Sequence, residues 1–114
     1  MDNYDSLTKD AKSFLLRLYK NYLDNTDRGT DRNSAKRFGS SLQIQKNITP
    51  DISVANISSY CFELDEKKLL HVIPGSNIAY RTELTNAGIN VMENRFAKNV
   101  AKVLDAIIKL KSAI

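Results

Sequence analysis

The chain has 114 residues, of which 42% are hydrophobic and 26% are charged. This composition suits one domain with one modest core, and four glycines and two prolines are too few for a low-complexity or disordered chain. No apolar run approaches membrane-spanning length, and the acidic first residues do not resemble a signal peptide. The single cysteine, Cys61, excludes an intramolecular disulfide. We therefore expect a cytoplasmic protein.

Positive charge is concentrated in the second half of the sequence. The formal net charge is +4, and the pI is about 9.2. Residues 1–66 contain 9 Lys or Arg against 10 Asp or Glu, whereas residues 67–114 contain 8 against 3. This asymmetry predicts long-range attraction of polyanions by the second half. A simpler interpretation is that the charge only keeps the protein soluble.

Two amphipathic helices are predicted before residue 50. The first begins at Asp5 or Ser6, which can cap it, and ends in the loop 25–30. The second begins near Asp31 or Asn33 and ends before Pro50, although Gly39 predicts a stop or bend inside it. The expected buried side chains of the first helix are Leu7, Ala11, Phe14, Leu15, Leu18, Tyr19, Tyr22 and Leu23, and those of the second are Ala35, Phe38 and Leu42.

A third helix is predicted after Ser53, which caps it. Its apolar side chains share one face of the helical wheel, and its polar side chains share the opposite face. The apolar face contains Val54, Ile57, Cys61 and Leu64, and the opposite face contains Ala55, Asn56, Ser59 and Glu63.

The segment 69–89 predicts a β-hairpin followed by a helix. An apolar run, 69–73, is followed by the turn sequence Pro74-Gly75-Ser76-Asn77 and by a second alternating run, 78–84. Thr85 then caps a fourth helix, which extends to about Asn94.

The last segment, 95–114, has the most regular apolar spacing in the chain, 4-3-4-3-4, which is a heptad seam. The seam consists of Phe96, Val100, Val103, Ile107, Leu110 and Ile114. Two arrangements satisfy it: pairing with a second chain, or packing against the first helix of the same chain. We expect the seam to form a homodimer, with the first helix covering Ala101, Leu104 and Ile108.

The order of elements and the sequence Glu83-Leu84-Thr85-Asn86-Ala87-Gly88 resemble small bacterial and phage winged-helix proteins of the YjcQ type. Leu64 through Leu70 and Tyr80 contribute to this resemblance, which covers residues 31–114. It implies an α+β, mostly α fold: a winged helix-turn-helix domain over residues 1–93, with a two-stranded wing over about 69–84, and a C-terminal amphipathic helix over 94–114. The third helix, about 53–65, would then be the recognition helix of a DNA-binding transcriptional regulator.

On this interpretation the predicted partner is double-stranded DNA. Base contacts are expected from Asn56, Ser59 and Glu63. Phosphate contacts are expected from Arg32, Lys36, Arg37, Lys67, Lys68 and Arg81. Three carboxylates, Glu63, Asp65 and Glu66, oppose this interpretation because they would repel phosphate. The alternative is a protein-interaction module that keeps the winged-helix shape without binding DNA.

The sequence predicts neither an enzyme nor a cofactor or metal site. It contains no Gly-rich phosphate loop, nucleophile elbow or HExxH motif. The single histidine, His71, lies ten residues from Cys61, and the pair is too small a set of ligands for zinc. We expect a structural or surface role for His71 and a buried, apolar role for Cys61.

Overall fold

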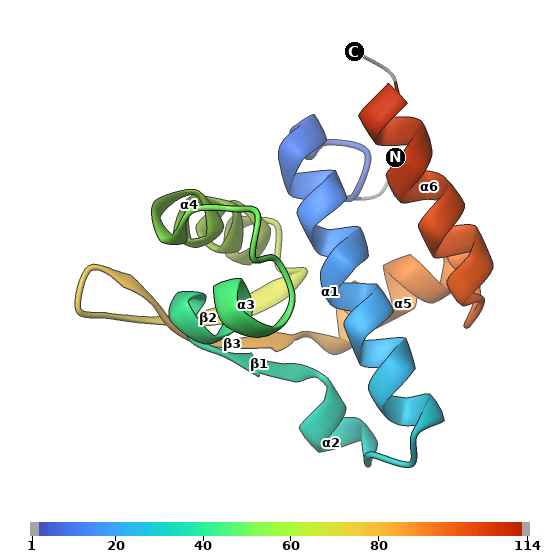
Figure 1. The fold of residues 1–114 in the computed structure, drawn as a ribbon, viewed down its shortest axis with the longest axis horizontal. Helices are drawn as coiled ribbons and strands as arrows, with labels where there is room; N and C mark the ends of the chain where they lie inside the picture. The colour runs from blue at the N-terminus through green and yellow to red at the C-terminus, as the bar shows by residue number, and fades with distance from the viewer. Residues whose placement is uncertain (1–2, 113–114) are drawn as a thin grey trace.

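The computed structural model describes residues 3–112 as a mostly helical α+β fold with a three-stranded antiparallel sheet (Figure 1). The strands lie in the order β1-β3-β2. The helices α3 and α4 lie over one face of the sheet, and α1 lies between them and α6 (Figure 1). The elements are α1 Lys9–Asp27, α2 Arg32–Ala35, β1 Arg37–Gly39, α3 Ser41–Asn47, α4 Val54–Glu66, β2 Leu70–Gly75, β3 Ile78–Leu84, α5 Asn86–Phe96 and α6 Val100–Ser112.

Helix α1 is the centre of the core. Its predicted apolar stripe is confirmed, because side chains from Ala11 to Leu23 pack in the interior and six of them, among them Phe14 and Tyr19, are at most 1% exposed. The predicted cap is wrong: Thr8, rather than Asp5 or Ser6, precedes the helix, and its side chain accepts a hydrogen bond from the backbone N–H of Ala11 at 3.2 Å.

The single second helix predicted between residues 31 and 48 is wrong. The chain forms the short α2, then β1, then α3. Gly39 ends β1 with φ +82°, and Ser40 starts α3 through a capping box with Gln43. Phe38 is buried as predicted, but it lies on a strand, and Leu42 is 58% exposed rather than buried.

The hairpin of β2 and β3 is confirmed. A two-residue turn, Ser76 and Asn77, joins the strands, and both residues have positive φ, as hairpin turns that match strand twist require. The hairpin projects past α3 and α4 (Figure 1). Val72 and Thr82 point into the fold and pair across the two strands, so this end of the hairpin is anchored in the core.

The sequence Leu84-Thr85-Asn86-Ala87-Gly88 forms the joint between the hairpin and α5. The Thr85 hydroxyl accepts from the N–H of Gly88 at 2.9 Å and donates to the carbonyl of Lys68 at 2.7 Å. Gly88 packs directly on the backbone of Leu69, where a Cβ would overlap the Leu69 carbonyl oxygen. The motif on which the family resemblance rests therefore fixes the start of α5 against residues 68 and 69.

Helix α6 packs along α1 within the same chain, which is one of the two arrangements that satisfy its seam. Val103 is 0% exposed, and four further seam residues are partly buried against the core: Phe96, Val100, Ile107 and Leu110. Ile114 lies outside the described residues. The Tyr19 hydroxyl donates to the carbonyl of Ala97 at 2.6 Å, which ties α1 to the bend between α5 and α6.

The structure also bears on the predicted division of the chain and on whether a helix could span a membrane. The predicted division at residue 94 falls inside α5, and the chain bends at 97–99 instead. Within residues 3–112, no helix is both long and apolar enough to span a membrane.

Candidate nucleic-acid interface

Helix α4 has one fully buried face and one exposed face, as the sequence predicts. Ser53 caps it, accepting from the N–H of Asn56 at 3.1 Å. Ile57, Cys61 and Leu64 are 0% exposed. Asn56 and Ser59 are exposed on the opposite face. Their side chains are free to meet a ligand without any movement of the core.

Glu63 does not join them as a candidate base contact. Its two carboxylate oxygens accept hydrogen bonds from the N–H and the hydroxyl of Thr8, at 2.8 and 2.9 Å. Because Thr8 caps α1, the carboxylate joins the start of α1 to the last turn of α4 and lies at the favourable, positive end of a helix. Glu63 thus has a structural contact, and its base contact stays a prediction.

Asp65 is also turned into the fold. It is half-buried, and its carboxylate accepts from the backbone N–H of Val72 at 3.4 Å, which ties α4 to β2. Of the three carboxylates that argue against a polyanionic partner, Glu66 is the one that is exposed. The partners of Glu63 and Asp65 are neutral N–H and O–H groups, so these hydrogen bonds hold the two carboxylates against the fold without cancelling their charge.

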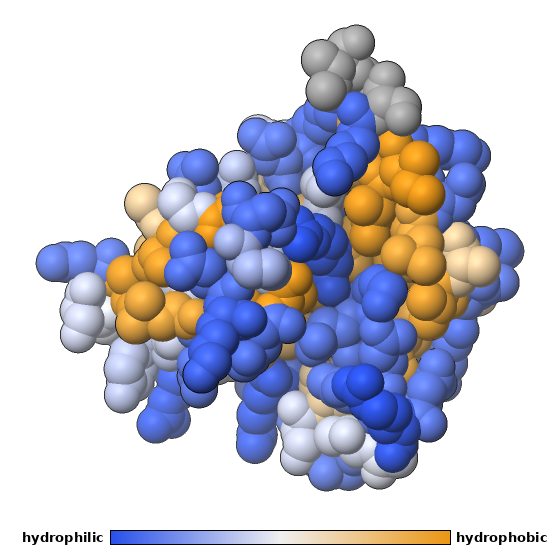
Figure 2. Space-filling view, viewed as in Figure 1, coloured by the Kyte–Doolittle hydropathy of each residue, from blue (hydrophilic) through white to orange (hydrophobic). Residues whose placement is uncertain are grey.

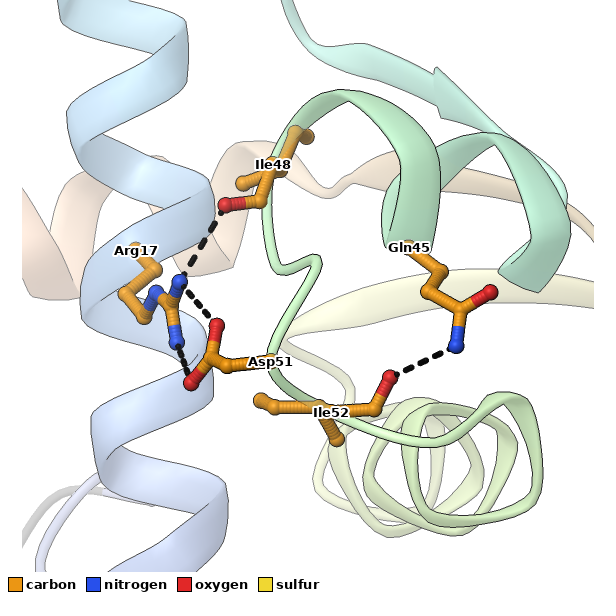
Figure 3. Close-up of polar contacts among 5 residues, drawn as sticks. All are labelled: Arg17, Gln45, Ile48, Asp51 and Ile52. Atoms are coloured by element: carbon orange, nitrogen blue, oxygen red, sulfur yellow. Dashed lines mark hydrogen bonds and ion pairs between the residues drawn. The ribbon is translucent and has the colours of Figure 1, made fainter.

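The turn between α3 and α4 is fixed to α1 by a forked ion pair (Figure 3). The Arg17 guanidinium donates to both carboxylate oxygens of Asp51, at 2.7 and 2.9 Å, and to the carbonyl of Ile48 at 3.3 Å. The Gln45 amide donates to the carbonyl of Ile52 at 3.0 Å. Two-point Arg–carboxylate contacts specify orientation as well as energy. These contacts hold the turn at Ile48 and at residues 51 and 52, so they fix the direction in which α4 begins.

This ion pair makes stability depend on pH. The hydrogen bond from Arg17 lowers the pKa of Asp51, so the contact stabilises the fold above the ordinary aspartate pKa and loses its effect as the pH falls through the lowered value. Asp51 is 60% exposed, which limits the contribution to below about 1 kcal/mol. We expect Asp51→Asn to lower the free energy of unfolding in urea at neutral pH by less than this amount, and the difference from the parent to shrink below about pH 4. A difference that stays constant on acidification would contradict this assignment.

A buried ring of three hydrogen bonds joins α3, α4 and β3. The Ala79 N–H donates to the Ser58 hydroxyl at 3.4 Å, and the Ser58 and Ser41 oxygens are 2.7 Å apart. The Ser41 hydroxyl donates to the Ala79 carbonyl at 3.3 Å. Because each hydroxyl has one proton, Ser58 must donate to Ser41. Pro74, which faces Ala79 across the hairpin, has no N–H to offer it. The ring therefore fixes the hairpin relative to α4.

The predicted phosphate contacts do not gather on one surface. Three of them lie at the end of the sheet away from the hairpin turn: Arg32 is 3.4 Å from Asn86, and Lys36 and Arg37 pair with Glu83 at 3.4 and 3.6 Å. Arg81 is exposed on the outer face of β3, across the sheet from α4. It lines a hollow of about 620 Å³ with Arg37, Ile73 and Tyr80.

Lys67 and Lys68 follow the last residue of α4 and are the predicted cations nearest to it in the chain. Lys68 is exposed and has φ 63°, and the Lys67 carbonyl accepts from the Asn3 amide at 2.8 Å. The structure thus separates the predicted cations into Lys67 and Lys68 beside α4, Arg81 on the hairpin, and a group at the base of the sheet.

Cys61 is buried and His71 lies on the surface, as the sequence predicts. Burial raises the pKa of the Cys61 thiol to about 12, so the thiolate is strongly disfavoured there. His71 is exposed on β2. The residues that the structure describes contain no group of three or more His, Cys, Asp or Glu arranged to hold a metal ion.

Sequence reasoning missed the residues that position α4. Arg17 and Asp51 are 34 residues apart, and no local motif links them. Ser58 carried a signal that was available: it lies one residue from Ile57 on the buried side of the helix. A small polar residue in such a position implies a buried hydrogen-bond partner.

Comparisons with protein-family models, with curated proteins and with solved structures found no match for this chain. The function is therefore inferred from the geometry of α4 and its surroundings.

Proposed function

We propose that this protein is a winged helix-turn-helix regulator of bacterial or phage type that binds double-stranded DNA through the exposed face of α4. In this assignment α3, the turn 48–53 and α4 form the helix-turn-helix, and β2 and β3 form the wing. The resemblance to proteins of the YjcQ type leads to the same proposal.

The observation that carries the proposal is the separation of side chains around α4. Asn56 and Ser59 face solvent, and their side chains can hydrogen-bond to the edges of bases in a major groove. The carboxylates of Glu63 and Asp65 are held within the fold by hydrogen bonds. The hairpin of β2 and β3 projects past α4 (Figure 1). In a winged helix, such a hairpin contacts the phosphate backbone beside the recognition helix.

The cations near α4 are fewer than the sequence suggests. Lys67 and Lys68 follow α4 directly, whereas Arg81 lies on the outer face of the hairpin, where its contact would be one made by the wing. We assign the phosphate contacts to these three residues. Lys36 and Arg37 are paired with Glu83 at the base of the sheet, so they contribute less.

The decisive variants remove the two candidate base contacts. A duplex is first selected from a random pool with the parent protein. Asn56→Ala and Ser59→Ala are each expected to weaken binding to that duplex by roughly 1–3 kcal/mol, or about five- to 150-fold, without changing thermal stability. Asn90→Ala, an exposed asparagine on α5, is the matched control and should bind as the parent does. Parent-like affinity of both α4 variants would remove α4 as the reading helix.

One observation favours a second candidate, a protein-interaction module that does not bind DNA. Helix α4 contains no Lys or Arg, although basic side chains supply most of the affinity for phosphate. The two candidates differ in the simplest measurement, since an interaction module would bind no duplex even at low salt.

A further inference from the structure

Helix α6 carries a second apolar surface besides the one that packs on α1. Ala101, Leu104 and Ile108 share the solvent-facing side of the helix, and we call them the α6 stripe. Leu104 is 40% exposed and Ile108 is 61% exposed. Figure 2 shows apolar side chains running along α6 at the surface. Since the stripe is separate from the buried seam, packing within the chain does not satisfy it.

The surroundings of the stripe are those of an interface rim. A groove of about 490 Å³ runs between α6 and α1, with Leu104 and Ile107 on one side. Its other side includes Arg17, Lys20 and Asp24, of which Lys20 and Asp24 form an ion pair at 2.6 Å. An apolar centre bordered by polar groups is the usual anatomy of a protein–protein interface.

We propose that the α6 stripe binds a second copy of this chain, with the two α6 helices antiparallel about a two-fold axis between Leu104 and Ile108. The stripe suits this symmetry because Leu104 of each copy then faces Ile108 of the other. Identical patches must be self-complementary across a two-fold axis, and two large aliphatic side chains at equal distances from the centre meet that requirement.

Charge selects the antiparallel arrangement. Asp105 and Lys109 are exposed beside the stripe, and they form an ion pair 2.9 Å long within the helix. In an antiparallel pair, Asp105 of each copy lies beside Lys109 of the other, so opposite charges meet twice. In a parallel pair, the flanks that carry Asp105 and Lys109 would lie on opposite sides of the interface, so these charges would not meet across it.

This inference is independent of the proposed function, because it concerns a surface away from α4. If both hold, the dimer presents two copies of α4 to two half-sites of one operator. Failure of DNA binding with a dimer present would overturn only the proposed function, and a monomer that binds DNA would overturn only the dimer.

Sedimentation velocity of the purified chain at tens of micromolar tests the interface. We expect the parent to sediment as a dimer and Ile108→Asp to sediment as a folded monomer, since an exposed side chain can change without unfolding the core. Leu42→Asp is the matched control, because Leu42 is 58% exposed but lies on α3, and it should stay dimeric. A monomeric parent, or a dimer that survives Ile108→Asp, would overturn the proposal.

The orientation has a test of its own. Asp105→Lys and Lys109→Asp are each expected to raise the dimer dissociation constant at least tenfold, and the double variant Asp105→Lys with Lys109→Asp should restore the parent value. A parallel pair predicts no such pattern, because the two flanks would lie on opposite sides of the interface and their charges would not meet. Equal dissociation constants for all four proteins would overturn the antiparallel arrangement.

Discussion

Replacing Gly88 with alanine is expected to lower the free energy of unfolding by roughly 1–3 kcal/mol. In most helices a Gly→Ala change stabilises, by about 0.5–1 kcal/mol, because alanine loses less backbone entropy. Here the added Cβ would overlap the carbonyl oxygen of Leu69, a backbone atom that cannot move aside as a side chain can. The sign of the effect is therefore opposite to the usual one.

Chemical denaturation measures this change directly. Asn90→Ala, on the exposed side of the same helix, is the control and should leave stability within roughly 0.5 kcal/mol of the parent. If Gly88→Ala is as stable as the parent or more stable, the close approach of α5 to Leu69 does not exist in solution.

Val103→Asp should have the largest effect of any single change in α6. Val103 is 0% exposed between α6 and α1, and an unpaired carboxylate there costs several kcal/mol if it stays buried. We expect α6 to separate from α1, with a large fall in the thermal unfolding temperature and rapid hydrogen exchange throughout α6.

Its neighbour provides the control. Lys102→Asp places the same carboxylate on the exposed side of α6, so it should leave the unfolding temperature almost unchanged. Near-parent stability of Val103→Asp would show that the seam does not pack on α1 and would return it to the role of a contact between chains.

The elements that the sequence predicted well are those whose signals are local. Ser53 and Thr85 cap their helices through bonds to residues three positions ahead, and the hairpin turn is set by adjacent residues. The buried face of α4 follows from helical spacing alone, so Asn56 and Ser59 were placed correctly on the exposed side.

The errors arose where a distant partner decides the outcome. Phe38 has the spacing of a helical residue, but its segment pairs with β3, more than forty residues later. The heptad pattern of α6 shows that the seam needs a partner without identifying it, and α1 is that partner. Helical spacing puts Glu63 on the polar side of its helix, but its contact with Thr8 depends on how α1 and α4 pack.

Binding to a pool of random-sequence duplexes across a salt series tests the central claim most directly. The proposal predicts binding at low salt that falls steeply as salt rises, with a logarithmic slope of about −2 to −3 if Lys67, Lys68 and Arg81 each neutralise one phosphate. It also predicts enrichment of particular sequences on repeated selection. If no duplex binds at low salt, α4 does not read DNA, and the protein-interaction module is the better account.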